Sequence, residues 1–374
     1  MAEPAHRPFP RIADGTLLLY RLFEVAEDID LGRAEEMLAG AAARLKLTGE
    51  RVGFLDLPDR PLTVNLGPRE VALEDGTAVR GTAVVRLFAL GVASVRYEIP
   101  IPPGAGPADL AAVVRAAADS AALERAARAV AEGLCARLGP ALVNPWSSPL
   151  FETYAIVFAR RLEEGGAPED AAGRDLARVL LGEPPGTALS PRTVDDVTRH
   201  RFSYDADDLC VIDWDAAFVV EPSGDRSVAD VLELATAQLL ELRYCDDVFE
   251  KELVAVAELL GRPRASSAWL FVGRYGRVTR RIQHRVVDSV EFIARVENAV
   301  RVVGDLYLAR IHRAAAERFR IHEWTAEVLR RQEVAARVAT LLHSEANSTL
   351  GHVLEATIIV LIVFEIAMAF WPKA

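Results

Sequence analysis

The first half of the chain contains short apolar runs that are separated by turn-forming residues. Runs of this length that are rich in Val, Ile, Phe and Tyr predict β-strands. Two of them, within residues 84–99, meet at Gly91 and predict either one bent strand or two successive strands. The other strands are expected at residues 16–26 and 149–159, with a last strand pair at 201–205 and 209–220.

Helices are expected between these strands. Asp30 and Ser190 stand where a helix N-cap would accept a hydrogen bond from the backbone. The Ala-rich stretch at residues 108–138 favours one long helix, because alanine has the highest helix propensity. Because predicted strands and helices both occur throughout this part of the chain, residues 1–225 are predicted to form an α+β domain.

From Ser227 onward the apolar positions recur about every 3.6 residues, which predicts long helices. The last of these stripes, from Ile321 to Leu342, steps by four and three residues in alternation, which is the spacing of a coiled-coil seam. We therefore expect residues 226–349 to form a long antiparallel helical hairpin. The apolar stripes lie at residues 231–260, 286–311 and 321–342.

The last part of the chain is strongly apolar. Residues 356–371 contain one charged residue, Glu365, and extension back to Leu350 gives roughly 22 residues, or about 33 Å of helix. This length predicts one transmembrane helix over residues 350–374, with a buried core helix as the alternative. Trp371 would then lie at the level of the lipid headgroups.

The charges on either side of this segment predict its orientation. Arg330, Arg331 and Arg337 precede it, and Lys373 alone follows it. The positive-inside rule then places the N-terminal domain in the cytoplasm and the chain in the inner membrane as a single-pass protein, with the lipid bilayer as a partner. A carboxylate inside a bilayer is costly, so Glu365 is expected either at an intramembrane contact between copies of a homo-oligomer or at the edge of a short span.

Composition limits the class of protein. The net charge of −11 disfavours an overall nucleic-acid-binding surface. The three cysteines lie far apart and form no CxxC pair, which argues against a zinc site or a disulfide framework. No lysine follows a glycine, so there is no Walker A loop, and GxSxG and HExxH are absent. We therefore expect no cofactor and no enzymatic activity.

Five segments stand out in order along nearly the whole chain: LFEVAEDIDL (22–31), SYDADDLCVIDWDAAFV (203–219), LLELRYCDD (239–247), DLYLARIH (305–312) and LEATIIVLIVFEI (354–366). Together they resemble the RMD (required for meiotic nuclear division) family, a domain of unknown function. The resemblance implies a bacterial, membrane-anchored member of a family whose mitochondrial proteins support translation. It implies no catalytic residues, because none is established for the family.

A basic run lies between Glu258 and Asp288, where no acidic residue occurs. Its arginines alternate with aromatic residues, and guanidinium groups suit phosphate oxygens. Residues 262–285 could thus contact an anionic lipid or RNA, or they could pair inside the fold with the acidic stretch at 205–252. The candidate contact residues are Arg274, Arg277, Arg280, Arg281 and Arg285.

Acidic residues gather near the end of the α+β domain. Asp213 and Asp215 are candidate metal ligands, because carboxylate oxygens suit Mg²⁺ or Ca²⁺. Their spacing fits no EF-hand loop. The alternative is that they lie at a solvated edge or pair with arginines elsewhere in the chain.

These observations predict a non-enzymatic, membrane-anchored interaction or scaffold protein that forms a homo-oligomer and binds an unidentified protein partner. The alternative is a CorA-like cation channel, in which Glu365 from several copies would line the path of the cation. One predicted span in place of two, and the absence of a GMN loop, argue against the channel.

Overall fold

A computed structural model describes residues 9–38, 42–44, 60–72, 78–118, 120–146, 148–164, 166–261, 280 and 306–369. The chain divides into two compact units. The first comprises Met1–Tyr244 and Val296–His322, and the second comprises Cys245–Arg295 and Glu323–Ala374. The long helix α6 (Ser227–Gly261) contributes to both units.

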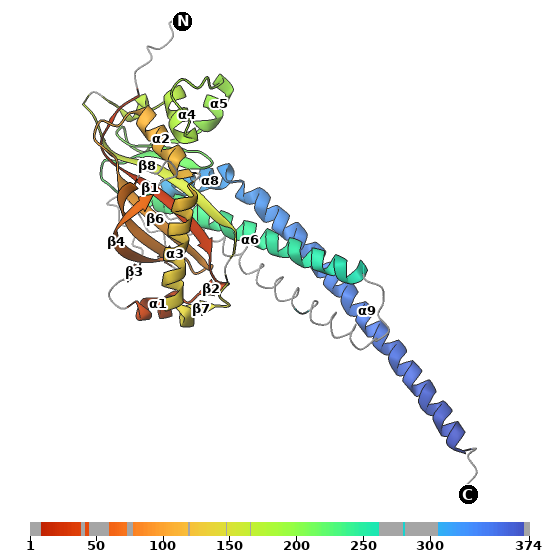
Figure 1. Ribbon diagram of the computed structural model, residues 1–374. Coiled ribbons are helices and arrows are strands. Elements are labelled where there is room, and N and C mark those ends of the chain that lie inside the picture. The colour runs from red at the N-terminus through yellow and green to blue at the C-terminus, as the bar shows by residue number, and fades with distance from the viewer. Residues whose placement is uncertain are drawn as a thin grey trace. The chain divides into compact units, whose positions relative to one another are not determined.

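In the described part of the first unit, nine strands form one mixed sheet in the order β3-β4-β5-β6-β1-β8-β11-β10-β9 (Figure 1). Neighbouring strands are antiparallel except β11 and β8, which are parallel. A separate short ladder joins β2 (Asp28–Ile29) to β7 (Leu142–Val143). The strands of the sheet are β1 (Ile12–Glu24), β3 (Ala42–Arg44), β4 (Leu62–Ala72), β5 (Ala78–Leu87), β6 (Val92–Pro100), β8 (Phe151–Leu162), β9 (His200–Phe202), β10 (Leu209–Ile212) and β11 (Ala216–Val220).

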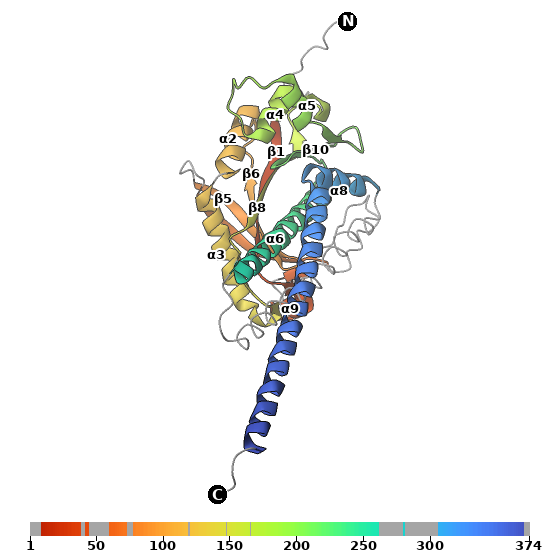
Figure 2. The same ribbon diagram turned by 90° about the vertical axis from the view of Figure 1, so that its right-hand side faces the viewer.

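Helices cover both faces of this sheet (Figures 1 and 2). On one face lie α2, α3 and α4, and on the other lie the first turns of α6 and helix α8. The helices besides α6 are α1 (Leu31–Met37), α2 (Pro107–Ala118), α3 (Ala121–Arg137), α4 (Gly173–Leu181), α5 (Pro191–Val197), α8 (Leu306–Arg318) and α9 (Ile321–Ala369).

The central strand β1 has buried side chains on both faces of the sheet. Leu19 pairs with Tyr97 of β6 and with Ala155 of β8, so hydrogen bonds use both edges of β1. Successive side chains point to opposite faces of a sheet. Leu19 belongs to the core under α2 and α3, whereas buried Leu18 and Tyr20 point to the face of α6. A strand that is buried on both faces needs a nearly continuous apolar sequence, which β1 has.

A network of buried charges attaches α6 to the sheet. Arg86 of β5 donates to Asp230 at 2.8 Å and also to Glu233, and Arg96 of β6 lies 3.7 Å from each of these carboxylates. The hydroxyl of Tyr20 lies beside these charges, and burial raises its pKa. The side chains of Arg86 and Glu233 are 4% and 1% exposed, so removal of either would leave an uncompensated buried charge.

Several predicted elements are confirmed. The strand predicted at residues 16–26 is β1, and that at 149–159 is β8. Asp30 and Ser190 cap α1 and α5 by accepting hydrogen bonds from backbone N–H groups at 3.0 and 3.1 Å. The predicted last strand pair is three strands, β9, β10 and β11, because the chain turns at 213–215.

Gly91 decides the arrangement of the apolar runs in residues 84–99. Its φ of 90° lies in the left-handed region that favours glycine, and the turn there separates β5 from β6. A Cβ at this position would lie 2.1 Å from the carbonyl oxygen of Ala26 and 3.1 Å from Oε1 of Glu24. The segment is therefore two successive strands, and glycine is required where they meet.

The single helix predicted at residues 108–138 is wrong, because the segment forms two helices, α2 and α3. The hydroxyl of Ser120 accepts from the backbone N–H of Leu123 at 3.1 Å and caps α3. The buried guanidinium of Arg21 donates to the carbonyl oxygens of Ala117 and Ala118 at the end of α2. These local bonds end one helix and start the next, which alanine propensity alone does not reveal.

The second unit is helical. Within it, α9 buries Val328, Gln332, Ala335, Ala339 and Leu342, which are spaced by four and three residues in alternation. The predicted coiled-coil seam is thus confirmed in spacing, although Ala339 takes the place expected for Val338. Such a seam fits a partner helix along one side of α9.

Among the described residues of this unit, the end of α6 is a neighbour of α9 and runs in the same direction (Figures 1 and 2). Arg331 of α9 pairs with Asp246 of α6 at 2.7 Å and with Glu250 at 3.1 Å. The antiparallel hairpin is predicted for consecutive helices, and α6 and α9 are not consecutive in the chain, so the hairpin stays a prediction. Most of the helix predicted at residues 286–311 lies outside the described residues.

The transmembrane helix predicted at residues 350–374 is wrong. Among the described residues, no helix has both the length and the apolar character that a bilayer crossing requires. The run between Glu355 and Glu365 comprises nine residues, or about 14 Å of helix, whereas the hydrocarbon layer is about 30 Å thick. The predicted single-pass location in the inner membrane is wrong for the same reason.

Candidate functional site

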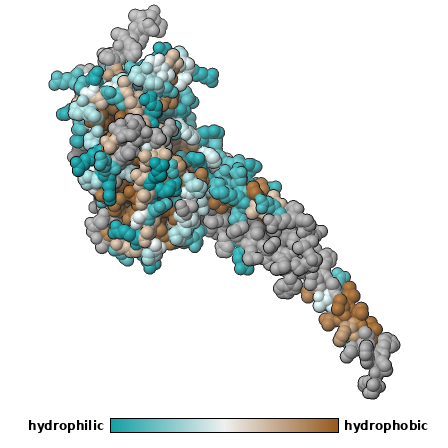
Figure 3. Space-filling view, in the orientation of Figure 1, coloured by the Kyte–Doolittle hydropathy of each residue, from teal (hydrophilic) through white to brown (hydrophobic). Residues whose placement is uncertain are grey.

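The C-terminal part of α9 exposes a continuous set of large apolar side chains. From Ile358 to Phe364 every residue is between 50% and 66% exposed. Successive helix positions point about 100° apart, so these side chains cover all sides of the helix. Figure 3 shows them as a hydrophobic patch. We call this surface the apolar end of α9, and it comprises Leu354, Ile358, Ile359, Val360, Leu361, Ile362, Val363, Phe364 and Ile366.

Two exposed carboxylates, Glu355 and Glu365, lie within this surface. The chain has no Lys or Arg between Arg337 and Lys373. The apolar end of α9 therefore carries negative charge without a basic residue of its own. Since the predicted membrane span is wrong, Glu365 is an exposed residue of this surface rather than an intramembrane residue.

The predicted anion-contact residues lie mostly outside the described part of the chain. Arg280 is described, and it is an exposed helical residue. Arg274, Arg277, Arg281 and Arg285 lie outside the described residues. Contact of residues 262–285 with an anionic lipid or RNA stays a prediction.

The two candidate metal ligands, Asp213 and Asp215, make different contacts. Asp213 accepts from Nε of Arg318 at 2.8 Å and is 3% exposed. The carbonyl oxygen of Asp215 accepts from the backbone N–H of Ala155 at 3.0 Å. Among the residues that the structure describes, no group of three or more His, Cys, Asp or Glu side chains is arranged to hold a metal ion.

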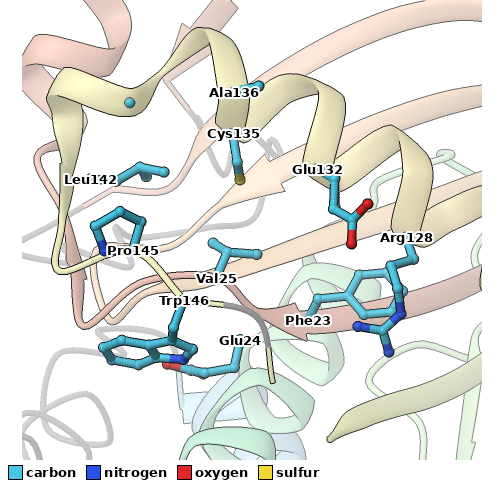
Figure 4. A pocket seen from close by; sticks show the side chains of 12 residues that line it. Phe23, Glu24, Val25, Arg128, Glu132, Cys135, Ala136, Leu142, Pro145 and Trp146 are labelled. Carbon is cyan, nitrogen blue, oxygen red and sulfur yellow. The ribbon is translucent and has the colours of Figure 1, made fainter. Parts of the chain in front are cut away.

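A cavity of about 390 Å³ lies beside the end of β1 (Figure 4). Three consecutive residues at this end form one wall, α3 forms a second, and the segment after α3 forms a third. Most of the lining is apolar. The lining residues are Phe23, Glu24 and Val25, then Arg128, Ala131, Glu132, Cys135 and Ala136 of α3, and finally Gly139, Leu142, Pro145 and Trp146.

Glu24 is the buried acid of this cavity, with 2% of its surface exposed. No backbone N–H, hydroxyl or basic side chain of the described residues donates to either of its carboxylate oxygens. The carboxyl of Glu241 in α6 lies next to it. Burial raises the pKa of Glu24 well above its usual range, and repulsion from Glu241 and a hydrogen bond between the two carboxyls add to this effect. All three effects favour the protonated form of Glu24.

The guanidinium of Arg128 is engaged away from Glu24. It lies 4.6 Å from the centre of the Phe23 ring, pairs with Glu124 at 3.3 Å and donates to the carbonyl oxygen of Ser148 at 3.1 Å. Three partners therefore already hold this cation. One positive charge beside the cavity does not balance its carboxyls.

An aromatic pair and a thiol complete the wall of the cavity. The rings of Trp146 and Tyr244 are stacked, with centres 5.1 Å apart and planes inclined by 13°. In Figure 4 the Glu24 side chain extends toward the indole of Trp146. Burial, together with the charge of Glu132, raises the pKa of the Cys135 thiol to about 11. Cys135 is therefore a neutral thiol and a poor nucleophile.

A second cavity, of about 430 Å³, lies between the end of β6 and α2. Its lining is apolar and includes Pro100, Pro102 and Pro103. The charged residue in the lining is Asp109, whose carboxylate accepts from the backbone N–H of Gly106 at 3.0 Å. This acid is satisfied inside the fold, unlike Glu24.

The sequence did not identify Glu24 as a site residue. A signal was present, because Leu18, Tyr20, Leu22 and Glu24 share one face of β1 and three of them are buried aromatic or aliphatic residues. A carboxyl on such a face predicts either a strand end or a functional group. Its neighbour Glu241 lies far along the chain, so the pair is visible only in the fold.

Comparison with known proteins identifies the first unit. The family model described as "Uncharacterized protein MJ0711, N-terminal domain" matches residues 14–226. The chain belongs to this family. The matched residues include β1 from Asp14 to Glu24, whereas Glu241 and the apolar end of α9 lie beyond them.

A relative among the curated proteins has a name that states no function. "Uncharacterized protein MJ0711" of Methanocaldococcus jannaschii is 22% identical over 179 residues, which cover 47% of this chain and 53% of the relative. The chain thus spans about half the length of that relative. No solved structure matches the chain. The match thus shows membership of an uncharacterized domain family. Membership of the RMD family stays a prediction.

Proposed function

We propose that the protein is a non-enzymatic interaction protein that assembles with copies of itself through the apolar end of α9. The observation that carries this proposal is the exposure of consecutive large apolar side chains from Ile358 to Phe364. A helix that is apolar on all sides is stable in water only when other surfaces cover it.

A second copy of the chain is the occupant that fits this surface. A helix that is apolar all round needs neighbours on several sides, and identical helices supply them with matched length and shape. The buried seam of α9 already shows coiled-coil spacing before this segment begins. An assembly of several α9 helices would extend that packing to the end of the helix.

The resemblance to the RMD family supports a role without catalysis, because no catalytic residues are established for that family. The segment at 354–366, which carries part of this resemblance, is the apolar end of α9. The CorA-like channel stays a prediction for which the described residues offer no separate support. The partner besides a second copy stays unidentified.

Sedimentation velocity of the full chain tests the proposal. The unaltered protein is expected to sediment as an oligomer, and the double variant Ile358→Ser, Ile362→Ser as a monomer, because two serines one helical turn apart interrupt one side of the apolar end. Both side chains are exposed, so the variant should keep its fold, which circular dichroism can verify.

The matched control is the double variant Val334→Ser, Leu341→Ser, which changes two exposed apolar residues of the same helix outside the apolar end. It is expected to sediment like the unaltered protein. A monomeric unaltered protein at micromolar concentration, or equal loss of assembly in the control, would refute the proposal.

A further inference from the structure

The cavity beside β1 contains a buried acid that the described protein does not neutralise. Glu24 lines this cavity, is 2% exposed and pairs with no basic side chain among the described residues. We propose that the cavity binds a small organic ammonium compound, with its positive group beside Glu24 and its apolar part against the cavity wall.

The charge of the cavity selects a cation. Two carboxyls line it, those of Glu24 and Glu132, and the carboxyl of Glu241 lies next to Glu24. The cation of the lining, Arg128, is held by Glu124, the Ser148 carbonyl and the Phe23 ring. A cavity with several carboxyls and low-dielectric walls concentrates positive ligands.

The burial of Glu24 indicates where the positive group lies. A carboxyl in an apolar environment without a basic partner is costly, unless a ligand supplies that partner. An ammonium group has three N–H donors and can serve two carboxyls at once. Glu24 and Glu241 lie next to each other, so one ammonium group could contact both carboxyls and take the place of a proton on the pair.

The walls favour an organic cation over a metal ion. Ca²⁺ and Mg²⁺ require about six oxygen ligands. The side chains that line this cavity include Phe23, Val25, Leu142 and Pro145, which supply none. An organic ammonium compound brings apolar carbon of its own, which these side chains can cover.

The size and the aromatic wall agree with a small ligand. A volume of about 390 Å³ is near the lower end of the range of about 300–1,000 Å³ for small-molecule sites. The indole of Trp146 is held by its stack on Tyr244, and an indole face attracts cations. The bound ligand would thus contact an aromatic wall whose position this stack fixes.

Binding of the ammonium ion is expected to leave the net charge of the site unchanged. In the proposed exchange the ammonium ion enters with its positive charge and one proton on the Glu24–Glu241 pair leaves to the solvent, so the charge of the site is conserved. Affinity is therefore expected to rise with pH through the titration of this pair. The other titratable or charged groups that face the cavity are Glu132, Arg128 and Cys135 of α3.

Isothermal titration calorimetry of the full chain with n-butylammonium chloride tests the proposal. Saturable binding is expected at one site, with proton release that shows as a dependence of the measured heat on the buffer. The uncharged isostere n-butanol is expected to bind at least about 100-fold more weakly, because it lacks the charge. Equal binding of n-butanol, or no binding of n-butylammonium, would overturn the proposal.

Two variants locate the site. Glu24→Gln keeps the shape of the side chain and removes the carboxylate, and it is expected to weaken n-butylammonium binding by about 100-fold and to abolish proton release. Glu36→Gln changes an exposed carboxylate outside the cavity lining and is expected to bind like the unaltered protein. Unchanged binding in Glu24→Gln would place the ligand elsewhere and refute the proposal, whatever the assembly state of the protein.

Discussion

Two buried ionisable side chains on the same sheet meet opposite conditions. Arg86 has two carboxylate partners, Asp230 and Glu233, which hold it in its charged state. Glu24 has another carboxyl, that of Glu241, as its neighbour, and its pKa is raised. The first arrangement stabilises the docking of α6, and the second leaves a site that a positive ligand can complete.

Replacement of Arg86 by Met should destabilise the protein strongly. The variant would leave Asp230 and Glu233 buried without the partner that lies closest to both. Loss of one member of a buried ion pair typically costs about 3–5 kcal/mol of unfolding free energy. Urea denaturation of the full chain, followed by circular dichroism, would measure this loss.

Arg160 provides the matched control. It pairs with Asp14 at 3.5 Å, and the two side chains are 52% and 47% exposed. Arg160→Met should cost less than about 1 kcal/mol, because water already solvates both charges. Equal losses in the two arginine variants would show that the Arg86 network adds nothing beyond a surface pair.

His312 makes stability depend on pH. Its Nε2 donates to Oε1 of Gln238 at 3.0 Å, and burial lowers its pKa from 6.5 to about 4. The unfolded chain takes up a proton near pH 6.5, whereas the folded protein does so near pH 4, so the contribution is present above 6.5 and is lost as the pH falls. Over this window the unfolding free energy should decrease by about 3 kcal/mol.

His312→Gln is the variant that isolates this effect. Gln does not titrate, so its unfolding free energy should fall less between pH 6.5 and pH 4 than that of the unaltered protein. Urea titrations at several pH values in this window would compare the two slopes. Parallel slopes would assign the acid sensitivity to other groups.

At the scale of the elements, the sequence predicted the strands, caps and helix faces that depend only on neighbouring residues. The apolar run of β1, the caps Asp30 and Ser190, and the seam of α9 could all be predicted from neighbouring residues. The break between α2 and α3 could not, because part of its cause is Arg21, which comes from a distant strand. The direction of α6 beside α9 is likewise a tertiary property.

The apolar end of α9 carries its own prediction. If copies pack through this surface, the carboxylates of Glu365 approach one another without a cation, since no Lys or Arg lies between Arg337 and Lys373. Glu365→Gln should then tighten assembly by about fivefold, the effect of removing about 1 kcal/mol of repulsion. Sedimentation over a dilution series would measure the shift.

Glu333→Gln is the control for this change, because Glu333 is an exposed residue of the same helix that pairs with Arg337 at 2.5 Å. Its substitution should leave the assembly unchanged. A weaker assembly of Glu365→Gln, or one that matches the control, would place Glu365 outside the contact between copies.

At the scale of the whole molecule, the α+β character of the first unit could be predicted, but neither the candidate cavity nor the fate of the C-terminal segment could. The cavity combines β1, α3 and the segment that follows α3, and the acidic pair adds a residue of α6. The membrane span was predicted from total apolar content. Glu355 and Glu365 divide that content into a run too short to cross a bilayer.

The position of β1 also has a consequence for protein synthesis. This strand is translated before β6 and β8, yet its two edges pair with them, and β8 ends at Leu162. At about 5–20 residues per second, the ribosome needs on the order of ten seconds to deliver the missing neighbour. During that interval β1, whose residues from Leu17 to Phe23 are all buried in the folded protein, has an unpaired edge, which makes it a natural contact for a chaperone.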